Sequence, residues 1–245
     1  MNRILFEPCE VRDGLATFSD VRAEHILDVL HGEVGQTLKT GIIDGPIGTS
    51  VIERIDGKAV TVRCAHDTPS LPPWIDLILA PPRPRSMKRL LPQLASLGVR
   101  RIFLVGAEKV EKAFWGAQLL REEVYRPLLV DGLQQAGTTQ LPTIHVSKSF
   151  AHFMRRNFDS TFGEQTPRIV AHPYAAGTSS KVFHPVFERG HIPVLAVGPE
   201  GGWTDFELAL LEEKGFDRMS LGPRILRTDT ALVALLGILM SLQSS

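Results

Sequence analysis

Two glycine-containing turns near the C-terminus carry the residue types best suited to a chemical site. The first comprises residues 198–202 (Gly-Pro-Glu-Gly-Gly) and follows the apolar run 194–197, and the second comprises residues 222–227 (Gly-Pro-Arg-Ile-Leu-Arg) and follows residues 219–221. Gly201 and Gly202 permit a positive φ and let the backbone approach a flat ligand closely. The first turn lacks the G-x-G-x-x-G spacing of dinucleotide-binding turns and the Gly-Lys-Ser/Thr ending of a phosphate loop, so both nucleotide-binding motifs are disfavoured.

Charged side chains accompany both turns. Glu200 lies within the first turn, and Arg227 ends the second turn just before an apolar helix expected over residues 231–242. Turns that follow neighbouring parallel strands open into one crevice, so we expect Glu200 and Arg227 at the mouth of a shared site. A guanidinium there can hold a carboxylate, a phosphate or a developing enolate oxygen, or it can form an ordinary ion pair with Glu200. The first turn by itself is equally consistent with a simple connection from a strand to a helix.

A basic stretch in the middle of the chain is a candidate phosphate-binding surface. Residues 71–126 carry ten basic and five acidic side chains, although the whole chain has 27 of each and a formal net charge of zero. The densest part supplies Arg83, Arg85, Lys88 and Arg89. Basic groups beside a helix N-terminus attract phosphate groups, so we expect these four side chains to contact them. A solvated helix start is an equally weighted alternative.

The elements that must position these groups differ between the two parts of the chain. Residues 1–70 alternate short apolar runs with glycine-containing turns, which predicts a small β barrel or sheet. Strands are expected over residues 36–43, 50–55 and 59–64, and a helix over residues 21–30. The proline-rich segment 68–73 is stiff and poor in backbone donors, so we place a domain boundary there.

After residue 73 strands and helices alternate, which predicts an α/β fold with a parallel sheet covered by helices. The expected strands are residues 76–80, 101–105, 143–146, 168–171, 193–197 and 219–221. Helices are expected over residues 86–97, over a long region ending near Ala136, and from about Thr204 and Thr228 onward. Residues 159–166 and 175–180 are expected to be flexible loops.

Composition limits the classes of function. With 43% hydrophobic residues the 245-residue chain can bury a sizeable core. Cys9 and Cys64 can form neither a disulfide framework nor a paired metal-ligand motif. The first residues lack the apolar stretch of a secretion signal, and the longest apolar run, 231–242, is too short to span a bilayer. These features predict a cytoplasmic, thiol-reduced protein without a metal site or a membrane partner.

The two turns and their flanks resemble the C-terminal motifs of the E-type bacterial methyltransferases of small-subunit ribosomal RNA. The motifs are Gly-Pro-Glu-Gly-Gly-Trp-Thr-x-x-Glu at residues 198–207 and Leu-Gly-Pro-Arg-Ile-Leu-Arg-Thr-Asp-Thr-Ala at residues 221–231. Their order and separation make the match highly specific. It extends more weakly through His172-Pro173, residues 96–99 and residues 25–30, and so covers nearly the whole chain. That family belongs to the SPOUT superfamily and makes N3-methyluridine in 16S rRNA.

The resemblance implies an architecture and a cofactor. A small β-rich, PUA-like RNA-binding domain would occupy residues 1–70, and a SPOUT methyltransferase domain with a C-terminal trefoil knot would occupy residues 73–245. S-adenosylmethionine would bind in three loops of the knot, at a site completed by a homodimer interface. By carry-over, the cofactor-binding residues are His172, Gly198, Glu200, Gly201, Gly202, Leu221, Gly222, Ile225 and Leu226.

The implied reaction is methylation of the N3 atom of a uridine in 16S rRNA, within the small ribosomal subunit. The N3 proton must leave, and the negative charge spreads onto the two flanking carbonyl oxygens, where a cation lowers the barrier. We expect Arg227 to supply that cation, Glu200 to position groups and Asp229 to act as the base. The basic residues Arg83, Arg85, Lys88 and Arg89 would contact the RNA.

The sequence also departs from the family pattern, mainly on the substrate side. Ser86 and Ser96 stand where the family usually has a Lys and a Glu, and Thr138 stands where it has an Arg. Asp229 replaces a usual Glu, and His31 replaces a frequent Arg. Two alternatives therefore stay open: a methyltransferase of the same fold with a different RNA substrate, and a non-catalytic RNA-binding or ribosome-assembly factor.

Overall fold

The computed structural model describes residues 2–173 and 191–243, which form two compact units. The first unit contains residues 1–72 and 129–141, and the second contains residues 73–128 and 142–245. Residues 175–180, expected to be a loop, lie outside the described residues. Among the described residues no helix has both the length and the apolar character needed to cross a membrane.

The first unit is built on a five-stranded sheet with the strand order β1-β3-β4-β5-β2. Its strands are β1 (Ile4–Phe6), β2 (Leu15–Phe18), β3 (Thr37–Ile42), β4 (Ile47–Asp56) and β5 (Ala59–Thr68), and its short helices are η1 (Pro8–Glu10), α1 (Val21–Glu24) and η2 (His25–Val29). Phe6, Ile26, Ile52, Val60 and Val62 are fully buried in its core. The β-rich character, the three expected strands and the helix near residues 21–30 are confirmed.

Residues 129–141 belong with this first unit because their backbone is bonded to it. The amides of Asn2 and Arg3 donate to the carbonyl of Gln134 at 3.3 and 3.1 Å, and the Thr139 hydroxyl donates to the carbonyl of Gly45 at 2.6 Å. A boundary drawn from composition at residues 68–73 does not include this segment.

The second unit contains a six-stranded, entirely parallel sheet with the order β11-β9-β10-β6-β7-β8. Its strands are β6 (Ile75–Leu79), β7 (Val99–Val105), β8 (Thr143–Ser147), β9 (Arg168–Ala171), β10 (Val194–Val197) and β11 (Asp217–Met219). Its helices are α2 (Pro84–Ser96), η3 (Lys112–Gly116), η4 (Gln118–Leu120), α4 (Phe150–His152), η5 (Phe153–Asn157), α5 (Phe158–Thr161), α7 (Asp205–Glu213) and α8 (Thr228–Gln243), and α3 (Glu122–Ala136) runs from this unit into the first. The expected α/β fold with a parallel sheet is confirmed.

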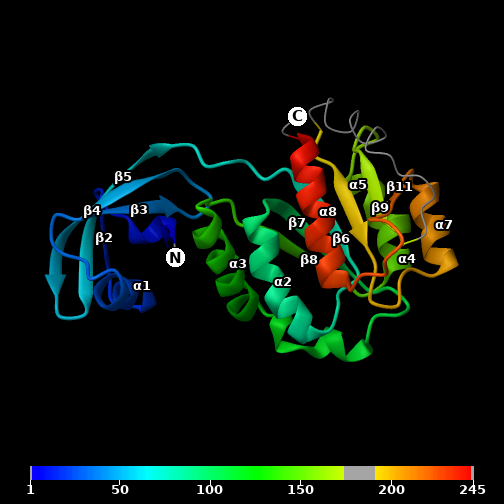
Figure 1. Cartoon of the computed structure of the whole chain (residues 1–245), viewed down its shortest axis with the longest axis horizontal. Helices are drawn as coiled ribbons and strands as arrows, with labels where there is room; N and C mark the ends of the chain where they lie inside the picture. The colour runs from blue at the N-terminus through cyan, green and yellow to red at the C-terminus, as the bar shows by residue number, and fades with distance from the viewer. Residues whose placement is uncertain (1, 174–190, 244–245) are drawn as a thin grey trace. The chain divides into compact units, whose positions relative to one another are not determined.

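Helices cover the central strands of the parallel sheet, whereas the edge strands β8 and β11 are largely exposed. All residues of β6 and β10 are buried, as is typical of parallel strands covered on both faces. Helices α2 and α8 lie side by side over the sheet (Figure 1). Leu90, Leu91 and Leu94 of α2 and Leu232, Leu236 and Leu239 of α8 supply their buried faces.

Two local predictions for the second unit are wrong. Strand β11 spans residues 217–219 rather than 219–221, because its partner β9 ends at Ala171, which is paired with Met219. Residues 159–161 are helical rather than part of a loop. The rings of Phe158 and Phe162 pack in a tilted arrangement with centroids 4.9 Å apart, and this contact between residues i and i+4 stabilises the helical turn.

Candidate functional site

Both glycine-containing turns and the end of β9 line one cleft of about 580 Å³ in the second unit. Strands β9, β10 and β11 run parallel, so the loops that follow them leave the same edge of the sheet. The cleft contains every residue that the resemblance assigned to the cofactor: His172, Gly198, Glu200, Gly201, Gly202, Leu221, Gly222, Ile225 and Leu226. The volume falls within the range of about 300–1,000 Å³ found for small-molecule sites.

Glycine is required in the turns at Gly202 and Gly222. These two residues have φ angles of +69° and +103°, which a side chain disfavours, and a Cβ at either position would meet no atom within 4 Å. Gly201, for which we also expected a positive φ, does not lie in that region. A Cβ at Gly201 would instead lie 2.8 Å from the Cδ atom of Lys109.

A capping box fixes the start of α7 directly after the first turn. The amide of Glu207 donates to the Thr204 hydroxyl at 3.3 Å, and the amide of Thr204 donates to Glu207 Oε2 at 2.8 Å. The other oxygen of this buried carboxylate accepts a 2.8 Å bond from the amide of Glu108. Glu207 thereby joins the loop after β10 to the loop after β7.

Lys109 is a cleft residue that the sequence analysis missed. Its Nζ atom donates to the carbonyl of Gly201 at 2.8 Å, and the side chain lines the cleft. The bond holds the first turn to the loop after β7 a second time, beside the Glu207 contact. A sequence separation of 92 residues left no local signal for this pairing.

Trp203 supplies a polar group that the cleft leaves available. The side chain is 7% exposed and lines the cleft, and its indole Nε1 has no hydrogen-bond partner among the described residues. Its ring packs against Phe150 with centroids 5.1 Å apart, which fixes the orientation of the indole. A buried donor without a partner is unusual in a folded protein, so this N–H is well placed for a ligand atom.

His172 lies at the end of β9, on the wall of the cleft. Burial, and secondarily the charge of Arg218, lowers the pKa of this imidazole below its ordinary value. The ring is therefore uncharged at neutral pH, which suits a site that receives a cationic ligand.

The three predicted catalytic residues occupy different environments. Glu200 is exposed on the cleft wall, where its Oε1 lies 3.5 Å from the amide of Arg83. Arg227 directly follows Leu226, the last residue of the second turn that lines the cleft. Its side chain is 70% exposed, and its Nε atom lies 3.7 Å from Asp229 Oδ1. The sequence allowed an ion pair between Arg227 and Glu200, whereas in the structure Arg227 pairs with Asp229.

The basic stretch is exposed along the first turns of α2. Arg83 pairs with Glu111 at 2.8 Å, and Arg89 lies 3.6 Å from Asp229. Arg85 and Lys88 have no ion pair among the described residues, so their charges are available to phosphate groups. Ser86, in the same segment, is buried and does not share this surface.

Comparisons with known proteins cover nearly the whole chain. A family model described as RNA methyltransferase domain matches residues 69–240. The protein named ribosomal RNA small subunit methyltransferase E from Treponema pallidum is 33% identical to the chain, over 98% of the chain and 91% of that protein. Among solved structures, the ribosomal RNA small subunit methyltransferase E of Neisseria gonorrhoeae, bound to S-adenosyl methionine, aligns with a TM-score of 0.77 at 23% identity over 99% of this chain and 98% of its own. A putative methyltransferase of Legionella pneumophila in complex with the same cofactor aligns with a TM-score of 0.75 at 25% identity, over 98% and 97% of the two chains.

Proposed function

The chain belongs to the ribosomal RNA small subunit methyltransferase E family, and on that premise we propose that it uses S-adenosylmethionine to methylate the N3 atom of a uridine in 16S rRNA. The observation that carries the proposal is the single cleft formed by three loops at one edge of the parallel sheet. The relatives from Treponema pallidum and Neisseria gonorrhoeae are named as small-subunit ribosomal RNA methyltransferases, and the solved structures from Neisseria gonorrhoeae and Legionella pneumophila hold this cofactor.

The residues of the cleft fit S-adenosylmethionine. Gly202 and Gly222 have no side chain and no atom within 4 Å of where a Cβ would lie, which leaves room for an adenosyl group. Apolar surface for this group comes from Leu221, Ile225 and Leu226. The unpartnered indole N–H of Trp203 can donate to one of its polar atoms. When bound, this cofactor supplies a methyl group on a sulfonium, a leaving group that needs no metal ion.

The charged residues beside the cleft would act on the uridine. As the N3 proton leaves, negative charge develops on the O2 and O4 atoms, and Arg227 would hold one of them through its fork of donors. Asp229, held between Arg89 and Arg227, is our proposed proton acceptor. Glu200, which lines the cleft, would position the substrate or the cofactor.

The finer architecture is also a proposal. The first unit, with its five-stranded sheet, supports a PUA-like RNA-binding domain over residues 1–70, and the cleft loops of the second unit support a trefoil-knotted SPOUT domain over residues 73–245. The RNA would be engaged as part of the small ribosomal subunit in the cytoplasm, with Arg83, Arg85, Lys88 and Arg89 on its phosphates.

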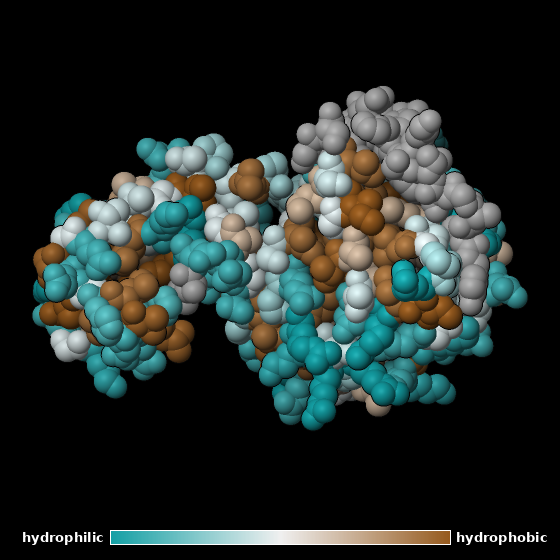
Figure 2. Space-filling model, viewed as in Figure 1, coloured by the Kyte–Doolittle hydropathy of each residue, from teal (hydrophilic) through white to brown (hydrophobic). Residues whose placement is uncertain are grey.

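An exposed apolar surface supports a homodimer. Ile225 and Leu226 of the second turn and Ile238 and Met240 of α8 are exposed. Figure 2 shows apolar side chains gathered over and beside α8 on the face in view. A second copy of the chain placed there would bury this surface and complete the cleft.

Calorimetric titration with S-adenosylmethionine tests this function against a non-catalytic scaffold. We expect saturable binding, and we expect Trp203→Phe to bind on the order of tenfold more weakly because it keeps the ring and loses one hydrogen bond. Trp74→Phe is the matched control, since the indole N–H of Trp74 donates to the carbonyl of Leu97 at 2.7 Å, away from the cleft. Absence of binding by the parent protein would contradict the proposal.

A further inference from the structure

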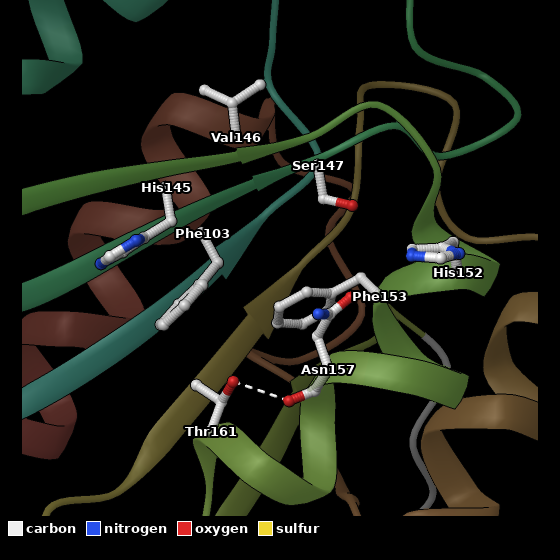
Figure 3. Close-up of a pocket in the computed structure, with 8 residues that line it drawn as sticks. All are labelled: Phe103, His145, Val146, Ser147, His152, Phe153, Asn157 and Thr161. Carbon is white, nitrogen blue, oxygen red and sulfur yellow. Dashed lines mark hydrogen bonds between the residues drawn. The ribbon is translucent and has the colours of Figure 1, made fainter.

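A second pocket of about 380 Å³ opens between β7, β8 and the helical segment α4–η5–α5 (Figure 3). It shares no lining residue with the cofactor cleft. Its wall combines aromatic rings with an amide and hydroxyl groups, and no carboxylate lines it. Neither the family motifs nor the proposed reaction assigns a role to these residues.

The aromatic wall of this pocket is suited to stacking. The imidazole of His145 lies over the ring of Phe103 with centroids 4.8 Å apart and an interplanar angle of 16°, and Phe153 packs on the same ring at 5.5 Å. His145 is nevertheless exposed, so a flat ligand can reach its ring. The part of the ring that packs on the protein is desolvated, and this partial burial, together with the charge of Arg101, lowers the pKa of His145 and keeps the ring neutral at pH 7.

The polar wall can recognise the edge of a planar ligand. The side-chain amide of Asn157 has no hydrogen-bond partner among the described residues, and Figure 3 shows it beside the ring of Phe153. The Thr161 hydroxyl donates to the backbone carbonyl of Asn157 at 2.6 Å, and its oxygen can still accept a hydrogen bond from a ligand. An amide that both donates and accepts matches the hydrogen-bonding edge of a nucleobase.

The surroundings of the pocket favour a polyanion. The segment 142–161 has three exposed basic residues, Lys148, Arg155 and Arg156, and one acidic residue, Asp159. Asp159 is bound to Lys214 at 2.6 Å, so its charge is already compensated. Phosphates on either side of a base in this pocket would therefore meet uncompensated positive charge.

Packed side chains connect the pocket to the cofactor cleft, although β8 is the edge strand farthest from β11 in the sheet. Strand β8 is parallel to the other strands, so the Ser147 end of the pocket is at the edge of the sheet where the cleft loops emerge. Phe150, directly before the pocket residues of α4 and η5, packs on Trp203 of the cleft, and Arg155 lies over the ring of Phe206 at 5.6 Å. One RNA strand can thus reach both sites.

We propose that this pocket binds an unpaired nucleobase of the substrate RNA, stacked on His145 and hydrogen-bonded to Asn157, while another nucleotide of the same RNA occupies the cofactor cleft. The inference rests on the proposed function for the identity of the RNA. It makes the pocket a specificity site, because it adds a base contact at a distance from the methylated base.

Photochemical cross-linking gives the most direct test. The full-length protein is irradiated with small ribosomal subunits, and cross-linked peptides are mapped by mass spectrometry. We expect a cross-linked nucleotide on a peptide containing His145 or Phe153. Cross-links to RNA that are confined to the cleft and to residues 83–89 would overturn the proposal. A pocket that cross-links to free uridine or adenosine monophosphate and not to RNA would overturn it as well.

Kinetics of two exposed variants provide a second readout. His145→Ala removes the stacking surface and Asn157→Ala removes the amide, and each should raise KM for the RNA on the order of tenfold with little change in kcat or in cofactor affinity. Ser160→Ala is the matched control, because Ser160 is exposed on α5, outside the pocket lining, and its hydroxyl donates to the backbone carbonyl of Asn157 and not to the side-chain amide. A control as impaired as the two variants would overturn the proposal by indicating a local structural effect.

The two proposals fail in different ways. If the parent protein methylates RNA and neither variant changes KM, the pocket proposal is wrong and the proposed function stands. If the parent protein transfers no methyl group, the proposed function fails, and the cross-link to His145 or Phe153 still decides whether the pocket binds RNA.

Discussion

The Nη2 atom of Arg89 lies 3.6 Å from Oδ2 of Asp229, joining the basic face of α2 to the first turn of α8. The other carboxylate oxygen of Asp229 lies 3.7 Å from Nε of Arg227. The stretch assigned to RNA and the turn assigned to chemistry therefore meet at one carboxylate that is 23% exposed. In the proposed function, phosphate groups arriving at Arg89 would compete with Asp229 for this arginine, which would couple RNA binding to the catalytic arrangement at this point.

Arg227→Lys tests whether this arginine stabilises the developing charge on uridine. Lysine keeps the charge and loses the planar fork of donors, and the loss of one well-aimed donor typically costs on the order of a hundredfold in turnover. We expect near-parental binding of S-adenosylmethionine and a single-turnover rate at least roughly a hundredfold lower. Arg218→Lys serves as the control, since Arg218 pairs with Glu212 on the surface and lies outside the cleft lining. A near-parental rate for Arg227→Lys would leave Arg227 as a structural partner of Asp229.

The unpaired cations of α2 are expected to dominate the electrostatic contact with RNA. The double change Arg85→Ala and Lys88→Ala should weaken RNA binding and reduce the slope of log K against log salt by about 0.7 for each lost contact to single-stranded RNA. Cofactor affinity should remain unchanged. Removing Lys112 and Arg121, which are exposed in the segment between β7 and α3, takes away the same charge and should leave the slope as it is. Equal slopes in the parent and in the Arg85 and Lys88 variant would mean that the RNA follows another path.

The two adjacent glycines of the first turn should respond differently to alanine. Gly202 has a φ of +69°, and a left-handed conformation costs an alanine about 1–2 kcal/mol, so Gly202→Ala should weaken cofactor binding on the order of tenfold. At Gly201 the new Cβ would only displace the Cδ atom of the flexible Lys109 side chain, and the effect should be smaller. Titration calorimetry on both variants checks the order, and an equal or reversed effect would show that the turn changes shape when it binds.

The sequence predicts most of the parallel sheet and the cleft, because both depend on local patterns. Apolar runs located β6, β7, β9 and β10, and residues 204–207 (Thr-x-x-Glu) have the spacing of the capping box that the structure has. The very short strands β1 and β2 were not predicted, since three or four residues give too little periodicity to distinguish them from loops.

Contacts between residues far apart in the chain could not be predicted. The bond from Lys109 to Gly201 and the packing of Phe150 on Trp203 both join loops that follow different strands. The exposure of the Arg227 side chain could not be predicted either, because the sequence places Arg227 after the second turn without showing in which direction its side chain points. The segment 129–141 belongs to the first unit through backbone and side-chain hydrogen bonds that composition does not reveal.

Nucleoside mass spectrometry of methylated RNA tests the central claim most directly. Small ribosomal subunits that lack the modification are incubated with the full-length protein and S-adenosylmethionine, and their 16S rRNA is digested to nucleosides. We predict that N3-methyluridine accumulates to about one equivalent per subunit with the parent protein, and far more slowly with Arg227→Lys. A methyl group found on another base, or no methylated nucleoside under conditions in which the cofactor is bound, would contradict the account.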